Sequence, residues 1–457
     1  MNELIQQFYD LLGAGGVLLG SDVSGRAASW RGGNTQAKAV LRPVSTEQVS
    51  QIMSICNNSG QSVVIQGGKT GLVDGATSTK NDIAISMERM NRIEELDLNN
   101  RTMTVQSGVP LQVIQEKAAA MQLQFPLDLG ARGSATIGGN ISTNAGGNRV
   151  IRYGMTRNLI LGLEVVLADG TIISSLNKVL KNNAAYDLKQ LFIGSEGTLG
   201  TVTKAVLRLS PALNFENTAL LAVSTYSELI ELLHYCDREF SGNLSSFEVM
   251  WNSYFQYSTA DNEYGKKSPM NRDYPFYVLV ETQSSHENGN EQFETVLSNV
   301  MEKGWVVDAV LAKSQSERNE LWAIRDNIEA LNLLGPVFYY DISLPIEQVA
   351  DYLAEAEQAL RQEWPDMQHA VFGHLGDGNI HIIASIGTDD PAQRYQFDDI
   401  LYRCLQSRDG SISAEHGIGT EKKAFLHYSR SPAEIALMKT LKLALDPKGI
   451  LNPGKVF

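Results

Sequence analysis

Cysteine and positive charge are both scarce in this 457-residue sequence, and each scarcity excludes a class of function. The three cysteines, Cys56, Cys236 and Cys404, are far apart and form no CxxC pair. This excludes an iron–sulfur cluster or a thiol-redox motif of the usual spacing. Lysine and arginine total 38 against 52 aspartates and glutamates, and the formal charge is −14. A nucleic-acid partner is not expected, because no dense row of cations could replace the counterions of a phosphate backbone.

Long apolar runs are also missing. The stretch over residues 159–168 is too short and too interrupted to span a bilayer. The first residues carry an early Glu3 and no basic lead into an apolar run, unlike a secretory signal or a transit peptide. We therefore expect a cytoplasmic protein without a membrane span. A chain of this length exceeds one compact core, and about two to four structural units are expected.

Helix and strand signals alternate through the first half of the chain. Ser45 can cap a helix that runs to about Asn57, and a strand over 62–65 leads directly into a glycine-rich block. The Ala168-Asp169-Gly170-Thr171 segment predicts a hairpin turn. We expect an α+β protein in three parts: a two-part α/β domain over 1–211 with a helix at 2–13, a ferredoxin-like domain over 212–410 with its helices on one face, and a mainly helical segment over 411–457.

Two glycine-rich blocks, at 66–71 and 133–147, favour binding of a phosphate-containing ligand. Gly67-Gly68-Lys69-Thr70 is not a Walker loop, because Val63 occupies the position where that loop requires glycine. The GxGxxG dinucleotide motif is absent too. Successive small residues after a strand can still direct several N–H groups into one concavity that binds a pyrophosphate. The alternative is that both blocks are tight turns with no ligand.

Three of the seven histidines form a compact pattern near the C-terminus. Residues 373–381 place His374 and His381 around a glycine-rich turn, and Glu415-His416 follows after one segment. Neutral imidazoles with one carboxylate suit zinc or a similar divalent ion, and three protein ligands leave a coordination position open for a substrate oxygen. A glycine-rich turn with a satisfied histidine at each end is the alternative.

The glycine-rich blocks, taken in order, resemble the FAD-binding blocks of the vanillyl-alcohol-oxidase-like flavoproteins. The similar segments are 66–71, 126–131, 137–140, 143–147 and 194–200. Together with 373–381, 413–417 and 446–454, they resemble the D-2-hydroxy-acid dehydrogenase branch, most of all its D-2-hydroxyglutarate dehydrogenases. The resemblance extends over about residues 35–457 and implies the flavoprotein fold of that family for the whole chain.

The resemblance implies a non-covalent FAD, since neither histidine nor cysteine occupies a recognisable flavin-tethering position. The residues that it assigns to the cofactor are Gln66, Gly67, Gly68, Lys69, Thr70, Gly71, Leu72, Pro126, Asp128, Gly133, Ser134, Thr136, Ile137, Gly139, Asn140, Thr143, Asn144, Gly146, Gly147, Glu196, Gly200 and Asn452. Lys69 stands where the family has asparagine, and its cation either assists the pyrophosphate or points to solvent.

The resemblance also implies a divalent metal ion, with zinc preferred, held by His374, His381 and Glu415. An α-hydroxy acid chelates such an ion through its hydroxyl and one carboxylate oxygen, and the ion lowers the hydroxyl pKa. His416 then contacts the substrate and accepts its proton. Arg325 matches the family arginine that pairs with the substrate carboxylate.

Polar substrate contacts of the family are missing from this chain. Tyr339 replaces a lysine, Ile383 replaces an asparagine, and the threonine that should follow Arg325 has no counterpart near residues 328–329. A second, distal carboxylate would lose its cation, and desolvating an unpaired carboxylate costs several kcal/mol or more. We therefore predict a D-2-hydroxy acid with a neutral side chain, D-lactate or larger, as the substrate.

The sequence leaves several substrates and partners open. The substrate could instead be D-2-hydroxyglutarate or D-malate, and a non-catalytic flavin-binding protein is the alternative from another class. We expect an electron-transfer flavoprotein or a quinone as the acceptor rather than oxygen, because no cluster motif supplies an internal route for electrons. A homodimer is compatible with the sequence.

Overall fold

The computed structural model describes residues 3–457, which separate into two compact units. Unit 1 contains the residues up to Gly146, then Gly154–Ala212 and Glu415–Phe457, and unit 2 contains Gly147–Tyr153 and Leu213–Ala414. The chain therefore passes between the units at 146/147, 153/154, 212/213 and 414/415. Nothing in the amino-acid sequence indicated that residues 147–153 belong with unit 2.

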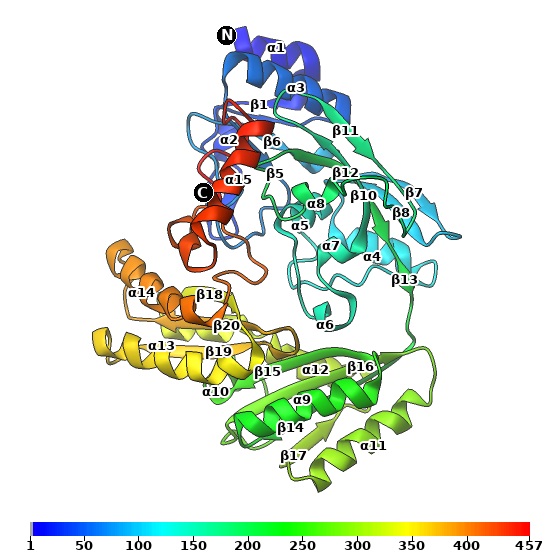
Figure 1. Cartoon of the computed structure of the whole chain (residues 1–457), viewed down its shortest axis with the longest axis vertical. Helices are drawn as coiled ribbons and strands as arrows, with labels where there is room; N and C mark the ends of the chain where they lie inside the picture. Colours follow the sequence, from blue (N-terminus) through cyan, green and yellow to red (C-terminus); the bar gives the residue numbers. More distant parts are fainter. Residues whose placement is uncertain (1–2) are drawn as a thin grey trace. The chain divides into compact units, whose positions relative to one another are not determined.

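Unit 1 contains two main sheets (Figure 1). The first has the order β1-β4-β6-β5, in which β4, β6 and β5 are parallel and β1 is antiparallel: β1 (Val17–Leu18), β4 (Ala39–Leu41), β5 (Val63–Gln66) and β6 (Ile83–Ser86). The second is antiparallel with the order β11-β10-β12-β8-β7: β7 (Ile93–Asp97), β8 (Thr102–Gln106), β10 (Ile160–Val166), β11 (Ile172–Ser175) and β12 (Thr201–Arg208). Two-stranded pairs are β2 (Ala27–Ser29) with β3 (Gly32–Asn34), and β9 (Leu123–Gln124) with β13 (Ser210–Pro211).

The helices of unit 1 follow the predicted alternation. They are α1 (Glu3–Leu12), α2 (Ser21–Ser24), α3 (Thr46–Ser59), α4 (Leu111–Ala119), α5 (Ile137–Thr143), α7 (Thr156–Leu159), α8 (Lys189–Phe192) and α15 (Pro432–Leu445). Helix α1 confirms the helix expected over 2–13, whose residue 2 lies outside the described residues. The segment from 415 onward contains α15 and a short 3-10 helix, Lys423–Tyr428, within a longer run of turns.

Helix α3 shows why the predicted elements form where they do. The Ser45 side chain accepts a hydrogen bond from the backbone N–H of Gln48, and Gly60 ends the helix in the left-handed conformation with φ 68°. Val49, Ile52, Met53 and Cys56 are spaced at i, i+3, i+4 and i+7, and all are buried in the core against the first sheet. The serine cap and this apolar spacing were both readable from the sequence.

The C-terminal segment extends the first sheet beside β5. The N–H of Val63 donates to the carbonyl of Ile450 at 2.8 Å, and the N–H of Asn452 donates back to the carbonyl of Val63 at 2.9 Å. In Figure 1 the red end of the chain accordingly lies among the blue elements of unit 1. Residues nearly four hundred positions apart therefore line one edge of this unit.

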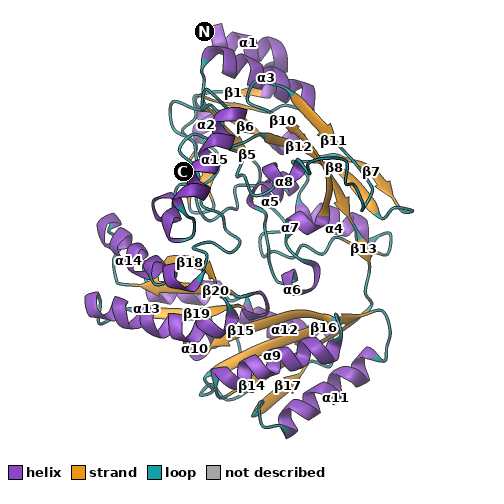
Figure 2. Ribbon diagram, in the orientation of Figure 1, coloured by secondary structure: helices purple, strands orange, loops and turns teal. Residues whose placement is uncertain are grey.

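Unit 2 is built on a seven-stranded antiparallel sheet with the order β17-β14-β16-β15-β19-β20-β18 (Figure 2). Its strands are β14 (Phe215–Val223), β15 (Leu244–Trp251), β16 (Phe276–Ser284), β17 (Asp308–Leu311), β18 (Phe338–Ser343), β19 (Gln368–His374) and β20 (Asn379–Ser385). Its helices are α6 (Val150–Tyr153), α9 (Tyr226–Phe240), α10 (Asn252–Ser258), α11 (Gly289–Glu302), α12 (Gln315–Arg325), α13 (Val349–Glu363) and α14 (Pro391–Arg403).

Both faces of this sheet are covered, not one as expected. Met250, Tyr277, Leu279 and Phe372 share one face and pack with α10 and α12 in a single apolar cluster. The intervening residues point to the opposite face, and those of the central strands are buried as well, for example Val278. The sheet is also wider than the two strand–helix–strand passages indicated, because β18, β19 and β20 extend it.

A buried ion cluster holds the short segment 147–153 in unit 2. The Glu281 side chain is fully buried, and Arg149 donates to one of its carboxylate oxygens. Arg318 adds hydrogen bonds at 2.7 and 3.0 Å, and the indole N–H of Trp322 donates at 2.8 Å. Burial alone would raise the pKa of Glu281, but Arg149 and Arg318 outweigh burial and hold that pKa below its ordinary value.

The cysteines and the apolar helices complete the description of the fold. All three cysteines are buried and free, and burial raises the pKa of Cys56 and of Cys236 to about 12. Within residues 3–457, no helix combines the length and the apolar character needed to cross a membrane.

Candidate functional site

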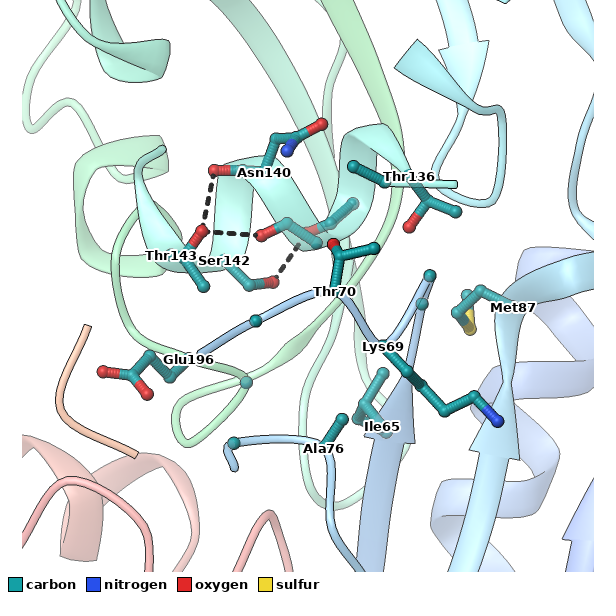
Figure 3. A pocket seen from close by; sticks show the side chains of 18 of the residues that line it. Ile65, Lys69, Thr70, Ala76, Met87, Thr136, Asn140, Ser142, Thr143 and Glu196 are labelled. Carbon is teal, nitrogen blue, oxygen red and sulfur yellow. Dashed lines mark hydrogen bonds between the residues drawn. The ribbon is translucent and has the colours of Figure 1, made fainter. Parts of the chain in front are cut away.

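Unit 1 contains a pocket where the two glycine-rich blocks meet. The first block follows β5 and the second leads into α5, as Figure 3 shows from close by. Several expected cofactor residues line it: Gly67, Gly68, Lys69, Thr70, Gly71, Thr136, Gly139, Asn140, Thr143, Glu196, Gly200 and Asn452. The pocket also includes residues that the sequence did not single out, among them Ser29, Met87, Ser107 and Thr201.

The glycines allow the two blocks to touch backbone to backbone. A Cβ at Gly68 would lie 2.0 Å from the carbonyl oxygen of Ser134, and one at Gly138 would lie 2.6 Å from the Cβ of Ser107. A Cβ at Gly67 would lie 2.4 Å from the Thr136 hydroxyl oxygen. No side chain fits at these positions, so close packing accounts for part of the glycine content.

Four buried polar atoms on the pocket wall lack a hydrogen-bond partner. They are Oγ of Ser107, Oγ1 of Thr136, Oδ1 of Asn140 and Oγ1 of Thr201. An unsatisfied buried polar group costs about 1–3 kcal/mol, so a pocket lined by four such atoms fits a polar ligand better than an apolar one. The hydroxyls and diphosphate of FAD have the complementary chemistry, and the pocket fits that cofactor in this respect.

The remaining expected cofactor residues are not among those that line the pocket. They are Gln66, Leu72, Pro126, Asp128, Gly133, Ser134, Ile137, Asn144, Gly146 and Gly147. Some have structural contacts: Asn144 ends α5 with φ 51°, and its Oδ1 accepts the N–H of Arg157 at 2.9 Å. Lys69 lines the pocket, but its ammonium donates to the Ala27 carbonyl at 2.6 Å and points away from α5 in Figure 3.

His416 lines the same pocket and belongs to unit 1. Asn452 lies on the wall, where its Oδ1 accepts the N–H of Ile65 at 2.9 Å and its Nδ2 donates to the carbonyl of Glu196 at 2.6 Å. The structure therefore brings the expected proton acceptor and the terminal asparagine into one pocket with the glycine-rich blocks.

In unit 2, His374 and His381 lie on neighbouring strands of the sheet. His374 ends β19 and His381 lies within β20, and their ring centroids are 5.3 Å apart. Both rings are largely buried. Two imidazoles at this separation, on rigid antiparallel strands, are the donors that zinc and similar ions prefer.

Each histidine has a buried carboxylate on its Nδ1 side. Glu248 Oε1 lies 2.8 Å from Nδ1 of His374, and Asp341 Oδ1 lies 3.9 Å from Nδ1 of His381. At His374, a carboxylate that receives Nδ1–H leaves Nε2 as the metal-binding nitrogen, which is a common arrangement around metal sites. At His381 the acid is near, but 3.9 Å is too long for a hydrogen bond. The donor set of unit 2 therefore fits a divalent ion.

Arg325 lies in the same cluster and is already paired with an acid. Its Nε and Nη2 both contact Glu248 at 2.8 Å, and its Nη1 donates to the exposed Asp326 at 3.2 Å. The Nη2 atom is also 3.4 Å from each ring nitrogen of His374. Burial would raise the pKa of Glu248, but its contacts with His374 and Arg325 outweigh burial and hold that pKa below its ordinary value.

Asp341 connects the β20 histidine to the segment that precedes Glu415. Its carboxylate accepts the side-chain amide of Asn379 at 2.8 Å and the backbone N–H of Ala414 at 3.1 Å. Ala414 is the last residue of unit 2, and Glu415 is the next residue in the chain. The backbone that leads to Glu415 is therefore fixed by the acid beside His381.

Tyr339 and Ile383 are cross-strand partners in β18 and β20. Both belong to the apolar cluster that contains Phe372, which is itself the cross-strand partner of His381. Ile383 is two residues from His381, so the two side chains point to the same face of the sheet. The side chains packed beside His381 on this face are therefore apolar, and Ile383 and Phe372 are buried.

Sequence reasoning missed Glu248 and Asp341, although each leaves a signal. Each is a single acid inside an apolar strand, in Phe247-Glu248-Val249 and Tyr340-Asp341-Ile342. An acid in such a strand needs a buried partner, because an unpaired buried charge is too costly. The partner cannot be named from the sequence, since Glu248 and His374 are 126 residues apart.

Comparisons with known proteins agree with this geometry. Residues 37–175 match the family described as FAD binding domain, and residues 213–456 match the family described as FAD linked oxidases, C-terminal domain. The chain is 39% identical to a D-2-hydroxyglutarate dehydrogenase of Xanthomonas citri pv. viticola over 425 residues, which cover 92% of this chain and 89% of that protein. It is 40% identical to the mitochondrial D-2-hydroxyglutarate dehydrogenase of Rattus norvegicus over 422 residues, covering 92% and 78%. The structure of p-cresol methylhydroxylase with substrate bound matches with a TM-score of 0.79 and 17% identity, over 100% of this chain and 96% of that one, a likeness of fold alone.

Proposed function

Because the chain belongs to the FAD-dependent D-2-hydroxy-acid dehydrogenases, we propose that it oxidises a D-2-hydroxy acid with a neutral side chain to the 2-oxo acid. The observation that carries the choice of substrate is the apolar packing beside His381, formed by the buried Ile383 and Phe372 and the partly buried Tyr339. An apolar environment at this place favours D-lactate and larger apolar D-2-hydroxy acids over a dicarboxylate.

The cofactor and the metal each have one chemical task in this proposal. Bound FAD supplies the acceptor for the hydride that leaves Cα of the hydroxy acid. A divalent ion, with zinc preferred, supplies a Lewis acid for the hydroxyl and carboxylate oxygens. We assign His374, His381 and Glu415 as its ligands. The carboxylates beside the two histidines and the fixed backbone before Glu415 support this assignment.

His416 is assigned as the group that accepts the hydroxyl proton. It lines the flavin pocket, and it directly follows a proposed metal ligand in the chain. An imidazole nitrogen can accept a proton from a hydroxyl group and is suited to this transfer. The electrons then leave the enzyme to an electron-transfer flavoprotein or a quinone.

Arg325 is assigned as the partner of the substrate carboxylate. Its guanidinium has five N–H donors, and the exposed Asp326 is a partner that a substrate carboxylate could replace at Nη1. At the position where relatives have a lysine, Tyr339 places an aromatic ring in the apolar cluster. Burying an unpaired distal carboxylate there would cost several kcal/mol.

A dicarboxylate, D-2-hydroxyglutarate or D-malate, is the second candidate. It is favoured by the identity of about two residues in five to relatives named D-2-hydroxyglutarate dehydrogenases. An artificial electron acceptor with a panel of D-lactate, a larger apolar D-2-hydroxy acid, D-malate and D-2-hydroxyglutarate separates the candidates by kcat/KM. A preference for D-2-hydroxyglutarate of about tenfold or more would refute the choice of a neutral side chain.

Variants of Tyr339 sharpen this comparison. Tyr339→Lys restores the cation of the relatives and is expected to raise kcat/KM for D-2-hydroxyglutarate relative to D-lactate. Tyr339→Phe is the matched control, since it keeps the ring and adds no charge. If Tyr339→Lys changes the ratio no more than Tyr339→Phe does, then position 339 does not contact the substrate side chain.

A further inference from the structure

Glu196 joins segments of unit 1 that are far apart in the sequence. Its carboxylate oxygens accept the backbone N–H groups of Ile418 at 2.7 Å and of Gly419 at 2.8 Å. Its own carbonyl accepts the side-chain amide of Asn452 at 2.6 Å. One residue thus holds both the loop that follows His416 and the terminal asparagine.

The loop after His416 has no room for a side chain at either of its two glycines. Gly417 has φ +87°, and a Cβ there would lie 2.8 Å from Oε1 of Glu196. Gly419 has φ +52°, and its Cβ would lie 1.9 Å from the carbonyl oxygen of Val73. Two glycines in conformations that other residues rarely adopt therefore bring the loop against Glu196 on one side and Val73 on the other.

Glu196 occupies a conformation that needs support from its surroundings. Its backbone has φ 51°, which is uncommon for a residue with a Cβ, and its N–H donates to the carbonyl of Ser142 at 2.8 Å. The side chain is only 8% exposed, and burial raises its pKa even though the two loop N–H groups act in the opposite direction. A strained backbone and a buried carboxylate each cost free energy, and packing alone requires neither of them. Strained residues of this kind cluster at functional sites.

We propose that Glu196 is a positioning residue, whose carboxylate fixes the loop after His416 and whose carbonyl fixes Asn452, so that both side chains keep one place in the flavin pocket. Figure 3 shows the Glu196 side chain extending away from Lys69 and Thr70, toward the faint orange chain of the C-terminal region. In this role Glu196 acts on the reaction through His416 and need not touch the substrate. The inference rests on the proposed role of His416.

Glu164 provides a matched control within the same unit. It has the same exposed fraction, 8%, and lies on β10 outside the pocket lining. Its carboxylate accepts the hydroxyls of Thr46 at 2.5 Å and Ser174 at 2.9 Å. Glu164→Gln and Glu196→Gln therefore remove one buried charge each, but only the second change faces the loop after His416.

The first measurement uses the FAD-loaded enzyme in stopped flow. Glu196→Gln keeps one acceptor oxygen but presents an N–H₂ group to one of the two loop N–H donors, so the loop loses one anchor. We expect Glu196→Gln to retain FAD, to slow flavin reduction by about tenfold or more at saturating substrate, and to change KM by less than about threefold. Glu164→Gln should leave both constants close to those of the wild type. Loss of FAD from Glu196→Gln, or a rate equal to that of Glu164→Gln, overturns the proposal.

The second measurement does not depend on the substrate. In protein labelled with ¹³C at histidine, the ring signal of His416 is identified by its loss in His416→Ala. We expect this signal to shift or broaden in Glu196→Gln and to stay unchanged in Glu164→Gln, because only the first variant frees the loop. If the wild type oxidises none of the D-2-hydroxy acids, the proposed function fails while this measurement still decides the role of Glu196. An unchanged His416 signal in Glu196→Gln overturns the inference.

Discussion

Replacing Gly68 with alanine tests whether the contact between the two glycine-rich blocks creates the flavin pocket. The new Cβ would lie 2.0 Å from the Ser134 carbonyl oxygen and 2.8 Å from its carbonyl carbon. Real Cβ contacts are essentially never shorter than 3.0 Å, so the blocks must separate by at least about 1 Å. Both contacting atoms belong to backbone, and no flexible side chain can move aside to relieve them.

The expected size of the effect follows from this overlap. Overpacking of a close contact costs about 1–3 kcal/mol, which corresponds to about fivefold to 150-fold in affinity if the strain is relieved by opening the pocket. Titration of the apoprotein with FAD, followed by flavin fluorescence, measures this loss. Circular dichroism and thermal unfolding establish that Gly68→Ala is folded.

Gly15→Ala is the matched control for this experiment. Gly15 is exposed, has no positive φ, and its added Cβ would meet nothing within 4 Å. Because Gly15 lies outside the glycine-rich blocks and the pocket lining, this variant should bind FAD like the wild type. If Gly68→Ala binds FAD within about twofold of Gly15→Ala, the blocks do not meet as described and the steric argument is refuted.

Three further outcomes are expected. His381→Ala should remove metal, measured by elemental analysis after gel filtration, while the flavin absorbance persists, because this histidine lies in unit 2 and the pocket lies in unit 1. Asn452→Ala leaves the N–H of Ile65 and the carbonyl of Glu196 without their partners, at about 1–3 kcal/mol each, so chemical denaturation should show a loss near 2–6 kcal/mol. Glu281→Gln should destabilise unit 2 by about 3–5 kcal/mol at neutral pH, because it leaves its arginine partners buried without a counter-charge. The depressed pKa of Glu281 means that its contribution is present above its ordinary value of 4.5 and is lost as pH falls below it, so the gap between wild type and variant should close in acid.

The features that could be predicted from the sequence are local ones, in which the residues that specify a structure lie close together in the chain. The Ser45 cap formed with its apolar helix, and the Ala168–Thr171 turn joins β10 to β11, since the Thr171 carbonyl accepts the Leu167 N–H at 2.9 Å. Both signals lie within a few residues of the structure that they specify. The family resemblance was confirmed for the same reason, because it rests on compact blocks in a fixed order.

Features that depend on distant pairings could not be predicted. Glu248 meets Arg325 across 77 residues, and nothing near either residue names the other. The placement of 147–153 in unit 2 depends on Glu281, which is 132 residues from Arg149. The second covered face of the unit 2 sheet was missed because α10 and α12 carry no signal for the side on which they pack. Such features are set by tertiary packing and not by local propensity.

The hydrogen bond between Ile65 and Asn452 spans 387 residues, and this has a consequence for protein synthesis. A ribosome that has made the first glycine-rich block must still make all of residues 213–414 before the partner of Ile65 exists. Unit 2 is continuous over that stretch and can begin to fold first, while unit 1 waits with an incomplete sheet edge at β5. Until then, the unpaired edge of β5 in unit 1 is the part of the nascent chain that can aggregate or bind a chaperone. FAD can bind to the complete pocket only after the C-terminal segment that contains Asn452 has been made.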